Sequence, residues 1–129
     1  MKMESNEIHQ IIEQNQRLLQ NLNTQRHCEC EIRQLISEII SDSVEIRLPF
    51  FTDYGRNIKF GKDIFINFNV TMVDLGGIVI EDHVFIGPGA YLISVNHMID
   101  PKRRKELILK RVHLEKMFGL ELVLRFYQE

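Results

Sequence analysis

The feature that most constrains the fold of this chain is a six-residue repeat that begins downstream of Pro49. Every sixth residue from Phe60 is large and apolar, and after a slip of two residues the spacing resumes at Ile80. This first series consists of Phe60, Ile66, Met72, Ile80, Ile86 and Leu92. A second apolar series follows four residues later in most units, at Ile64, Val70, Val84 and Ala90. Together the two series predict a parallel β-helix, in which each short strand forms one side of a coil.

The residues between the apolar positions suit the corners of such a coil. Gly61, Asn67 and Gly87 each follow a large apolar residue, and glycine and asparagine tolerate the backbone angles of tight corners. An antiparallel sandwich would instead place its turns about every 8–12 residues. The six-residue period therefore favours the β-helix.

The first 42 residues have a helical pattern instead. One apolar stripe between Asn6 and Gln25 predicts an α-helix, for which Ser5 is a suitable N-cap. A second stripe predicts another helix that ends near Asp42; its members are Ile32, Leu35, Ile36, Ile39 and Ile40. Two short helices bury little by themselves, so we expect them to pack as an appendage against the coil. A partner-binding coiled coil is the alternative.

Composition excludes several classes of protein. No apolar run in the 129 residues approaches the roughly 18 that a membrane-spanning helix needs, and the opening residues 1–7 lack the apolar core of a secretory signal. The net charge of −2 gives no general attraction to nucleic acid or anionic lipid. We therefore expect one soluble, cytoplasmic domain with an appendage.

The cysteines do not change this expectation. Cys28 and Cys30 are too close in sequence for a useful disulfide, which favours a reducing cytoplasm. With His27 and Glu29 they form a short cluster of potential metal ligands. Residues two apart point to different sides of a helix, and no second ligand group occurs elsewhere, so we expect no metal site.

Several motifs resemble the maltose, galactoside and nodulation-type O-acetyltransferases, which are hexapeptide-repeat acyltransferases. The motifs are the segments 49–58, 65–69, 85–88 and 96–101, together with Asp74. The resemblance implies a left-handed parallel β-helix with an N-terminal helical segment. It also implies a homotrimer, acetyl-CoA as the acetyl donor and no metal.

The resemblance assigns roles to four residues. His97 matches the general base in the loop that leaves the coils, although Met98 stands where the family usually has proline. Asp53, Asn67 and Asp74 match positions on the acceptor side of the site. The chemistry suits these residue types, because an alcohol needs a base to attack a thioester, and carboxylates and amides bind sugar hydroxyls.

Each acceptor residue also has a structural alternative. Asn67 and Asp74 stand where a coil corner needs a residue that tolerates unusual backbone angles, and Asp53 could organise the turn before Tyr54. His83 falls on a corner and is expected to be solvated rather than catalytic. The basic run 102–105 is usually a solvated face, though the resemblance places this loop near the donor site.

The boundaries follow from these patterns. We expect a helical segment at 1–44, coils at 45–96, an active-site loop with the start of the next coil at 97–116, and a divergent tail at 117–129. The tail has no six-residue phase, so the C-terminal coils are expected to be missing, together with most of the donor pocket. No residues that bind acetyl-CoA can therefore be named.

A lost base near Lys116 is our hypothesis for the tail. Back-translation of residues 117–129 with one added base and suitable synonymous codons reads Asn-Val-Trp-Ile-Gly-Ala-Gly-Ala-Thr-Ile-Leu-Pro-Gly, which continues the repeat in phase. Unpaired strand edges would then reduce stability and weaken acetyl transfer. Sequencing the coding DNA tests the idea, which is wrong if no shifted frame restores the repeat.

Two functions remain open from the sequence. The first is acetyl-CoA-dependent O-acetyl transfer to a sugar hydroxyl, with a maltose-like or galactoside-like acceptor and direct transfer assisted by His97. The second is a non-catalytic, truncated remnant that acts at most as a self-associating structural fragment. The sequence does not identify the acceptor.

Overall fold

The computed structural model describes residues 5–41, 43–97, 99–103 and 106–116, so the tail at 117–129 and its suspected frameshift lie outside the described residues. Helices α1 (Ser5–Thr24) and α2 (Glu29–Leu35) precede the strands. The strands are β1 (Val44–Ile46), β2 (Phe50–Thr52), β3 (Ile58–Phe60), β4 (Ile64–Ile66), β5 (Val70–Val73), β6 (Ile78–Ile80), β7 (Phe85–Ile86), β8 (Tyr91–Ile93), β9 (Val95–His97), β10 (Leu107–Leu109) and β11 (Val112–Leu114).

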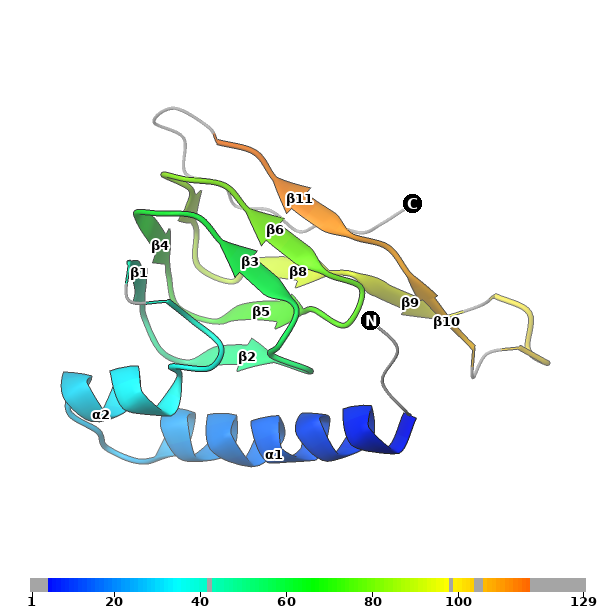
Figure 1. Ribbon diagram of the computed structural model, residues 1–129, viewed down its shortest axis with the longest axis horizontal. Helices are drawn as coiled ribbons and strands as arrows, with labels where there is room; N and C mark the ends of the chain where they lie inside the picture. Colours follow the sequence, from blue (N-terminus) through cyan, green and yellow to red (C-terminus); the bar gives the residue numbers. More distant parts are fainter. Residues whose placement is uncertain (1–4, 42, 98, 104–105, 117–129) are drawn as a thin grey trace.

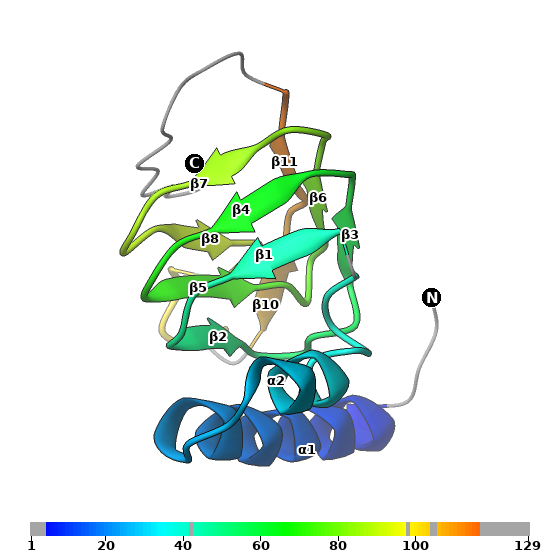
Figure 2. The same ribbon diagram turned by 90° about the vertical axis from the view of Figure 1, so that its left-hand side faces the viewer.

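Three parallel sheets form the sides of a coil (Figures 1 and 2). Their strand orders are β1-β4-β7, β2-β5-β8 and β3-β6-β11. Val44 pairs with Ile64, so the chain completes one full turn of the coil between these two residues. In Figure 2 the strands β1, β4 and β7 run to the left across the front as the chain climbs, which is a left-handed turn. The predicted left-handed parallel β-helix is thus confirmed.

Both apolar series line the inside of the coil. Ile66, Met72 and Val70 are fully buried and Ile64 is 2% exposed, because alternate residues of a strand point to opposite sides. Phe60 is only partly buried and packs against this core. The core is therefore a set of stacked columns, each with one residue per turn.

The corners use left-handed backbone, but two residues after the glycine and asparagine positions that the sequence analysis named. Asp63, Asn69 and His83 have φ angles of 57°, 59° and 61°, and Gly77 has 97°. The conformation is uncommon for a residue other than glycine, and asparagine and aspartate tolerate it best. The slip in the repeat falls at the corner between β5 and β6, which contains Gly77.

Helices α1 and α2 lie beneath the lower end of the coil (Figure 2), and Leu19 and Leu22 join its core. Asn23 covers the free lower edge of β2. Its amide Nδ2 donates to the carbonyl of Phe50 at 2.9 Å, and its Oδ1 accepts the Phe50 N–H at 3.0 Å. One side chain thereby replaces the strand that would otherwise pair there.

The second helix is shorter than the sequence predicted. Helix α2 ends at Leu35 rather than near Asp42. The chain turns at Ile36, whose carbonyl accepts the N–H groups of Ile39 and Ile40, both at 2.8 Å. This turn buries all three isoleucines against the coil, so tertiary packing overrides the helical stripe. Among the described residues, neither helix combines the length and apolarity that crossing a bilayer requires.

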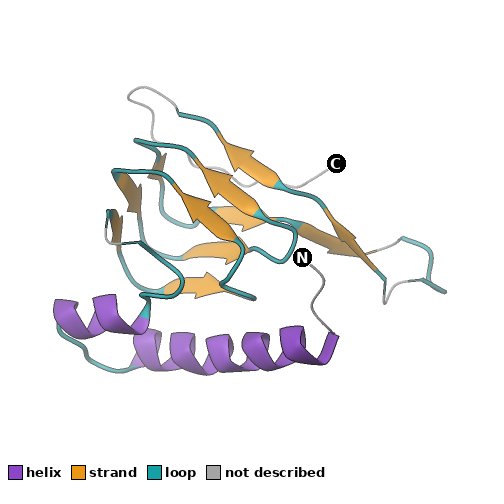
Figure 3. Cartoon of the chain, viewed as in Figure 1, coloured by secondary structure: helices purple, strands orange, loops and turns teal. Residues whose placement is uncertain are grey.

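An antiparallel arm interrupts the third turn of the coil (Figures 1 and 3). Strands β9 and β10 pair so that His97 faces Leu107 and Val95 faces Leu109. The coil resumes at β11, where Val112 pairs with Ile78, whereas Ile78 itself pairs with Ile58 in the turn below. The turn from Ile78 to Val112 is therefore the longer of the two, and the arm accounts for its added length. We call residues 95–109 the arm.

Candidate active site

The four buried polar side chains of the described residues gather at the corner between the second and third sheets. They are Asn15, Thr52, Asp74 and Ser94, which are 1%, 8%, 0% and 0% exposed. The strand pairing places Tyr54, Asp74 and Ser94 at equivalent positions on successive turns. We call this region the polar corner, and the arm leaves the coil at its top.

Asp74 is the centre of the polar corner. Its Oδ1 accepts the backbone N–H groups of Tyr54 at 3.0 Å and Gly55 at 2.9 Å, and its Oδ2 accepts that of Asn57 at 3.0 Å. Asp53 reaches in the other direction, since its Oδ1 accepts the N–H groups of Tyr54 at 2.6 Å and Asp74 at 2.8 Å. The two carboxyl groups thus cross-link the first two turns.

Burial raises the pKa of the Asp74 carboxyl above its usual value. Loss of solvent and then the hydrogen-bonded carboxyl of Asp53 raise the pKa of Asp74 from 3.8 to about 7. The backbone N–H groups of Gly55 and Asn57 oppose this shift, because they stabilise the charged form. Near neutral pH the carboxyl of Asp74 is therefore partly protonated, and perturbed carboxyls of this kind occur often at functional sites.

These contacts bear on the two aspartates that the resemblance placed on the acceptor side. The Asp74 side chain is inaccessible in a single chain, and its oxygens are occupied by main-chain N–H groups. Asp53 is half-buried and also binds the main chain. Asp53 organises the turn before Tyr54, as its structural alternative predicted, whereas Asp74 holds the corner through hydrogen bonds and not through an unusual backbone angle.

His97 lies at the end of β9, where its side chain is exposed. Its backbone N–H donates to the Oδ1 of Asn96 at 2.9 Å. Farther along the arm, Lys102 is exposed, and Arg103 pairs with Glu106 at 2.7 Å. The arm therefore presents an accessible imidazole together with basic side chains, beyond the polar corner.

Asn67 lies elsewhere on the coil. It stands between β4 and β5, at the opposite end of the β2-β5-β8 sheet from the polar corner. Its Oδ1 accepts the N–H of Phe68 at 2.8 Å, and its own N–H donates to the carbonyl of Ile86 at 3.0 Å. Within one chain the structure brings Asp53 and Asp74 together, but it does not bring Asn67 to them.

Sequence analysis missed three residues of the polar corner, which are Asn15, Thr52 and Ser94. Asn15 of α1 donates to the Oγ1 of Thr52 at 2.6 Å and to the carbonyl of Asp53 at 3.0 Å. Ser94 lies directly before the arm and is fully buried. A signal for Ser94 existed, since one turn later it occupies the same inward-facing position of the coil as Asp74. A signal for Asn15 existed as well, because it interrupts the apolar stripe of α1 between Ile12 and Leu19.

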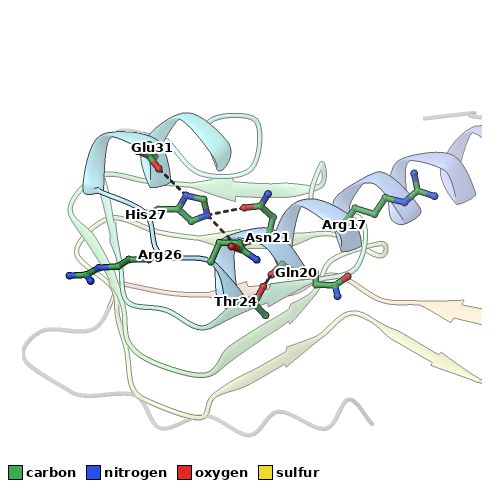
Figure 4. Close-up of a pocket in the computed structure, with 8 residues that line it drawn as sticks. Arg17, Gln20, Asn21, Thr24, Arg26, His27 and Glu31 are labelled. Carbon is green, nitrogen blue, oxygen red and sulfur yellow. Dashed lines mark hydrogen bonds and ion pairs between the residues drawn. The ribbon is translucent and has the colours of Figure 1, made fainter.

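A hollow between the two helices involves the histidine of the short Cys-His cluster (Figure 4). His27 Nδ1 contacts the Oε2 of Glu31 at 3.0 Å, and its Nε2 contacts the Oδ1 of Asn21 at 2.8 Å. The His27 hydrogen bond holds the pKa of Glu31 below its usual value. Arg17 and Arg26 point away from each other (Figure 4), so they do not converge on a ligand. Among the described residues no group of potential ligands is arranged to hold a metal.

The fold and the polar corner define a hexapeptide-repeat protein with an exposed histidine on an arm. No protein-family model matches the chain. A galactoside O-acetyltransferase of Lactococcus lactis is 31% identical over 96 residues, which are 72% of this chain and 46% of that protein. Nodulation protein L of Rhizobium leguminosarum is 38% identical over 60 residues, or 46% of this chain and 32% of that protein.

Solved structures agree with these relatives. A hexapeptide-repeat acetyltransferase from Vibrio cholerae, complexed with acetyl coenzyme A, matches with a TM-score of 0.71 and 34% identity. The match covers 83% of this chain and 61% of that chain. The chain is thus a homologue of galactoside and nodulation acetyltransferases, which confirms the resemblance. It spans less than half the length of the two curated relatives described above.

Proposed function

We propose that this chain is part of an acetyl-CoA-dependent acetyltransferase that acts on a hydroxyl group of a sugar. The observation that carries the proposal is the exposed imidazole of His97 on an arm of the coil, in a homologue of acetyltransferases. The Vibrio cholerae structure, which contains acetyl coenzyme A, supports acetyl-CoA as the donor. Relatives that act on galactosides support a sugar as the acceptor.

The chemistry assigns one task to His97. An acceptor hydroxyl attacks the thioester carbonyl of acetyl-CoA, and the imidazole of His97 removes the hydroxyl proton as the new C–O bond forms. The tetrahedral intermediate collapses with cleavage of the C–S bond, and the imidazolium returns the proton to the departing thiolate. Histidine suits both steps, because its charge changes near neutral pH.

The acceptor would bind near Asp53, Asn67 and Asp74, as the sequence analysis expected. Asp53 and Asp74 lie at the polar corner, whereas Asn67 lies at the other end of the same sheet. This separation supports a homotrimer, in which neighbouring copies bring these regions together at a shared site. Sedimentation of the purified chain tests the assembly, and a monomer at assay concentration would argue against a shared site.

The alternative is a non-catalytic fragment that only self-associates. Its support is the apolar surface of the arm, where Leu107, Ile108 and Leu109 are 46%, 43% and 54% exposed. Exposed apolar side chains that lie together mark interaction surfaces. Titration with acetyl-CoA in a calorimeter discriminates between the two functions, because binding of the donor supports only the enzyme.

Replacement of His97 tests the proposed catalysis. We expect wild-type protein to release thiol from acetyl-CoA in the presence of a hexose or disaccharide. His97→Ala should lower the rate by about 100-fold or more, the usual contribution of a general base. His83→Ala is the matched control, because His83 is exposed at a coil corner and contacts Asp63. Equal rates in wild type and His97→Ala would contradict the role of His97.

A further inference from the structure

Ser94 makes four hydrogen bonds at the base of the arm while fully buried. Its Oγ donates to the carbonyl of Val73 at 2.5 Å and accepts the N–H of Gly76 at 2.9 Å. Its backbone N–H donates to the same carbonyl of Val73 at 2.9 Å, and its own carbonyl accepts the N–H of Lys110 at 2.9 Å. A buried hydroxyl with two such bonds fixes its surroundings, because an unpaired buried polar group is costly.

The hydrogen bond between Ser94 and Lys110 closes the base of the arm, and we call this pair of residues the neck. Ser94 directly precedes β9, and Lys110 directly follows β10, so the chain leaves and re-enters the coil at this pair. The hydroxyl of Ser94 ties the same point to Val73 and Gly76 on the turn below. The neck is therefore fixed both across the arm and down to the coil.

Gly76 shows how closely the neck lies on the polar corner. A Cβ atom at this position would stand 2.2 Å from the carbonyl oxygen of Ser94 and 2.9 Å from the backbone nitrogen of Lys110. Both are main-chain atoms, which cannot move aside as the end of a side chain can. The neck can therefore occupy this position only because Gly76 has no side chain.

We propose that Ser94 is a positioning residue, whose buried hydroxyl anchors the arm and sets where His97 lies relative to the coil. His97 is three residues beyond Ser94 on a strand whose base has no freedom to shift while these bonds hold. The consequence for catalysis rests on the proposed function of His97. The anchoring itself is a property of the arm and is measurable without catalysis.

Hydrogen exchange in the full chain tests the anchor directly. In Ser94→Ala we expect the hydrogen-bonded backbone amides of β9 and β10 to exchange roughly tenfold faster than in wild type, because local opening becomes easier. Ser94→Thr keeps the hydroxyl and should restore most of the protection. Val84→Ala is the control, since Val84 is buried in the coil core at a different corner. It should lower the melting temperature without changing exchange in the arm.

Kinetics separate positioning from general loss of stability. Ser94→Ala should lower kcat about tenfold or more while KM for acetyl-CoA changes less than about twofold, since misplacement of a catalytic group affects mainly the chemical step. Faster exchange in the arm with no transfer by wild type would uphold the anchor and refute the proposed function. If the arm amides exchange no faster in Ser94→Ala than in Val84→Ala, the proposal that Ser94 anchors the arm is wrong.

Gly76→Ala provides a second variant in case Ser94→Ala does not fold. It keeps the serine hydroxyl but forces the neck away from the corner, because the new Cβ overlaps the carbonyl of Ser94. We expect the same faster exchange in β9 and β10. The wild-type chain alone gives a further check, since the amides of Gly76 and Lys110 must be protected. Rapid exchange of both would overturn the proposal.

Discussion

Asp74 shows how one buried carboxyl can organise a corner of irregular backbone. Its oxygens accept three main-chain N–H groups, those of Tyr54, Gly55 and Asn57. Burial opposes charge on the carboxyl, whereas hydrogen bonds from the main chain favour it. The result is a carboxyl that is largely protonated in mild acid and ionises near neutral pH.

The raised pKa of Asp74 predicts a pH dependence of stability. In the unfolded chain the carboxyl ionises near its usual pKa of 3.8, but in the folded chain it does so only at about 7. The folded state therefore holds an extra proton between these values, so the stability that Asp74 contributes is full below about pH 4. It falls as the pH rises to about 7.

Urea unfolding at a series of pH values measures this effect. We expect the free energy of unfolding of wild type to decrease between about pH 4 and pH 7 more than that of Asp74→Asn, which cannot ionise. The difference between the two proteins, rather than either curve alone, isolates Asp74. A difference that is constant over this range would contradict the raised pKa.

At the scale of elements, helix α1 closes the lower end of the coil with side-chain amides as well as with apolar residues. Asn23 satisfies both main-chain groups of Phe50, and Asn15 binds Thr52 and the carbonyl of Asp53. An uncovered strand edge invites pairing with other chains. The helix therefore protects the first strand edge as well as burying leucines.

Asn23→Ala tests the edge cover. The change leaves the N–H and carbonyl of Phe50 without their side-chain partner, so we expect the free energy of unfolding to fall by about 1–3 kcal/mol. Gln14→Ala is the matched control, because Gln14 is exposed on the same helix. Chemical denaturation measures both variants, and equal stabilities would show that the amide of Asn23 contributes nothing at this edge.

The sequence predicted the elements better than their junctions. The spacing of Ile66, Met72 and Ile86 was sufficient for the coil, because burial alternates along the coil strands such as β4 and β5. The end of α2 was wrong, since packing of Ile36 against the coil replaced its last turn. The network around Asp74 could not be read from the sequence, because its bonds join main-chain groups of neighbouring turns.

At the scale of the whole molecule, the coil is a one-dimensional stack of turns. Each inward residue contacts mainly the same position one turn above and below, as Ile66 does with Ile46 and Ile86. In repeat architectures stability is approximately the sum of such neighbour contacts. A residue in the middle of the stack should therefore matter more than the same residue at its lower end.

Ile66 and Ile46 form a matched pair for this test. Ile66 is fully buried between two turns, whereas Ile46 lies in the lowest turn and is only partly buried. Ile66→Ala should cost about 2–5 kcal/mol of unfolding free energy, as for other core truncations, and Ile46→Ala distinctly less. Thermal and urea unfolding give both values. Equal losses would show that the helices enclose the lowest turn as fully as the middle one.

The closed neck of the arm has a consequence for how this scaffold could change. Because the chain departs at Ser94 and returns at Lys110, which are directly hydrogen-bonded, the turns above and below keep their register whatever lies between. Segments of different length or composition can be grafted between these two residues at little cost to the coil, since loop closure depends only weakly on length. The scaffold thereby allows the arm to vary while the coil stays the same.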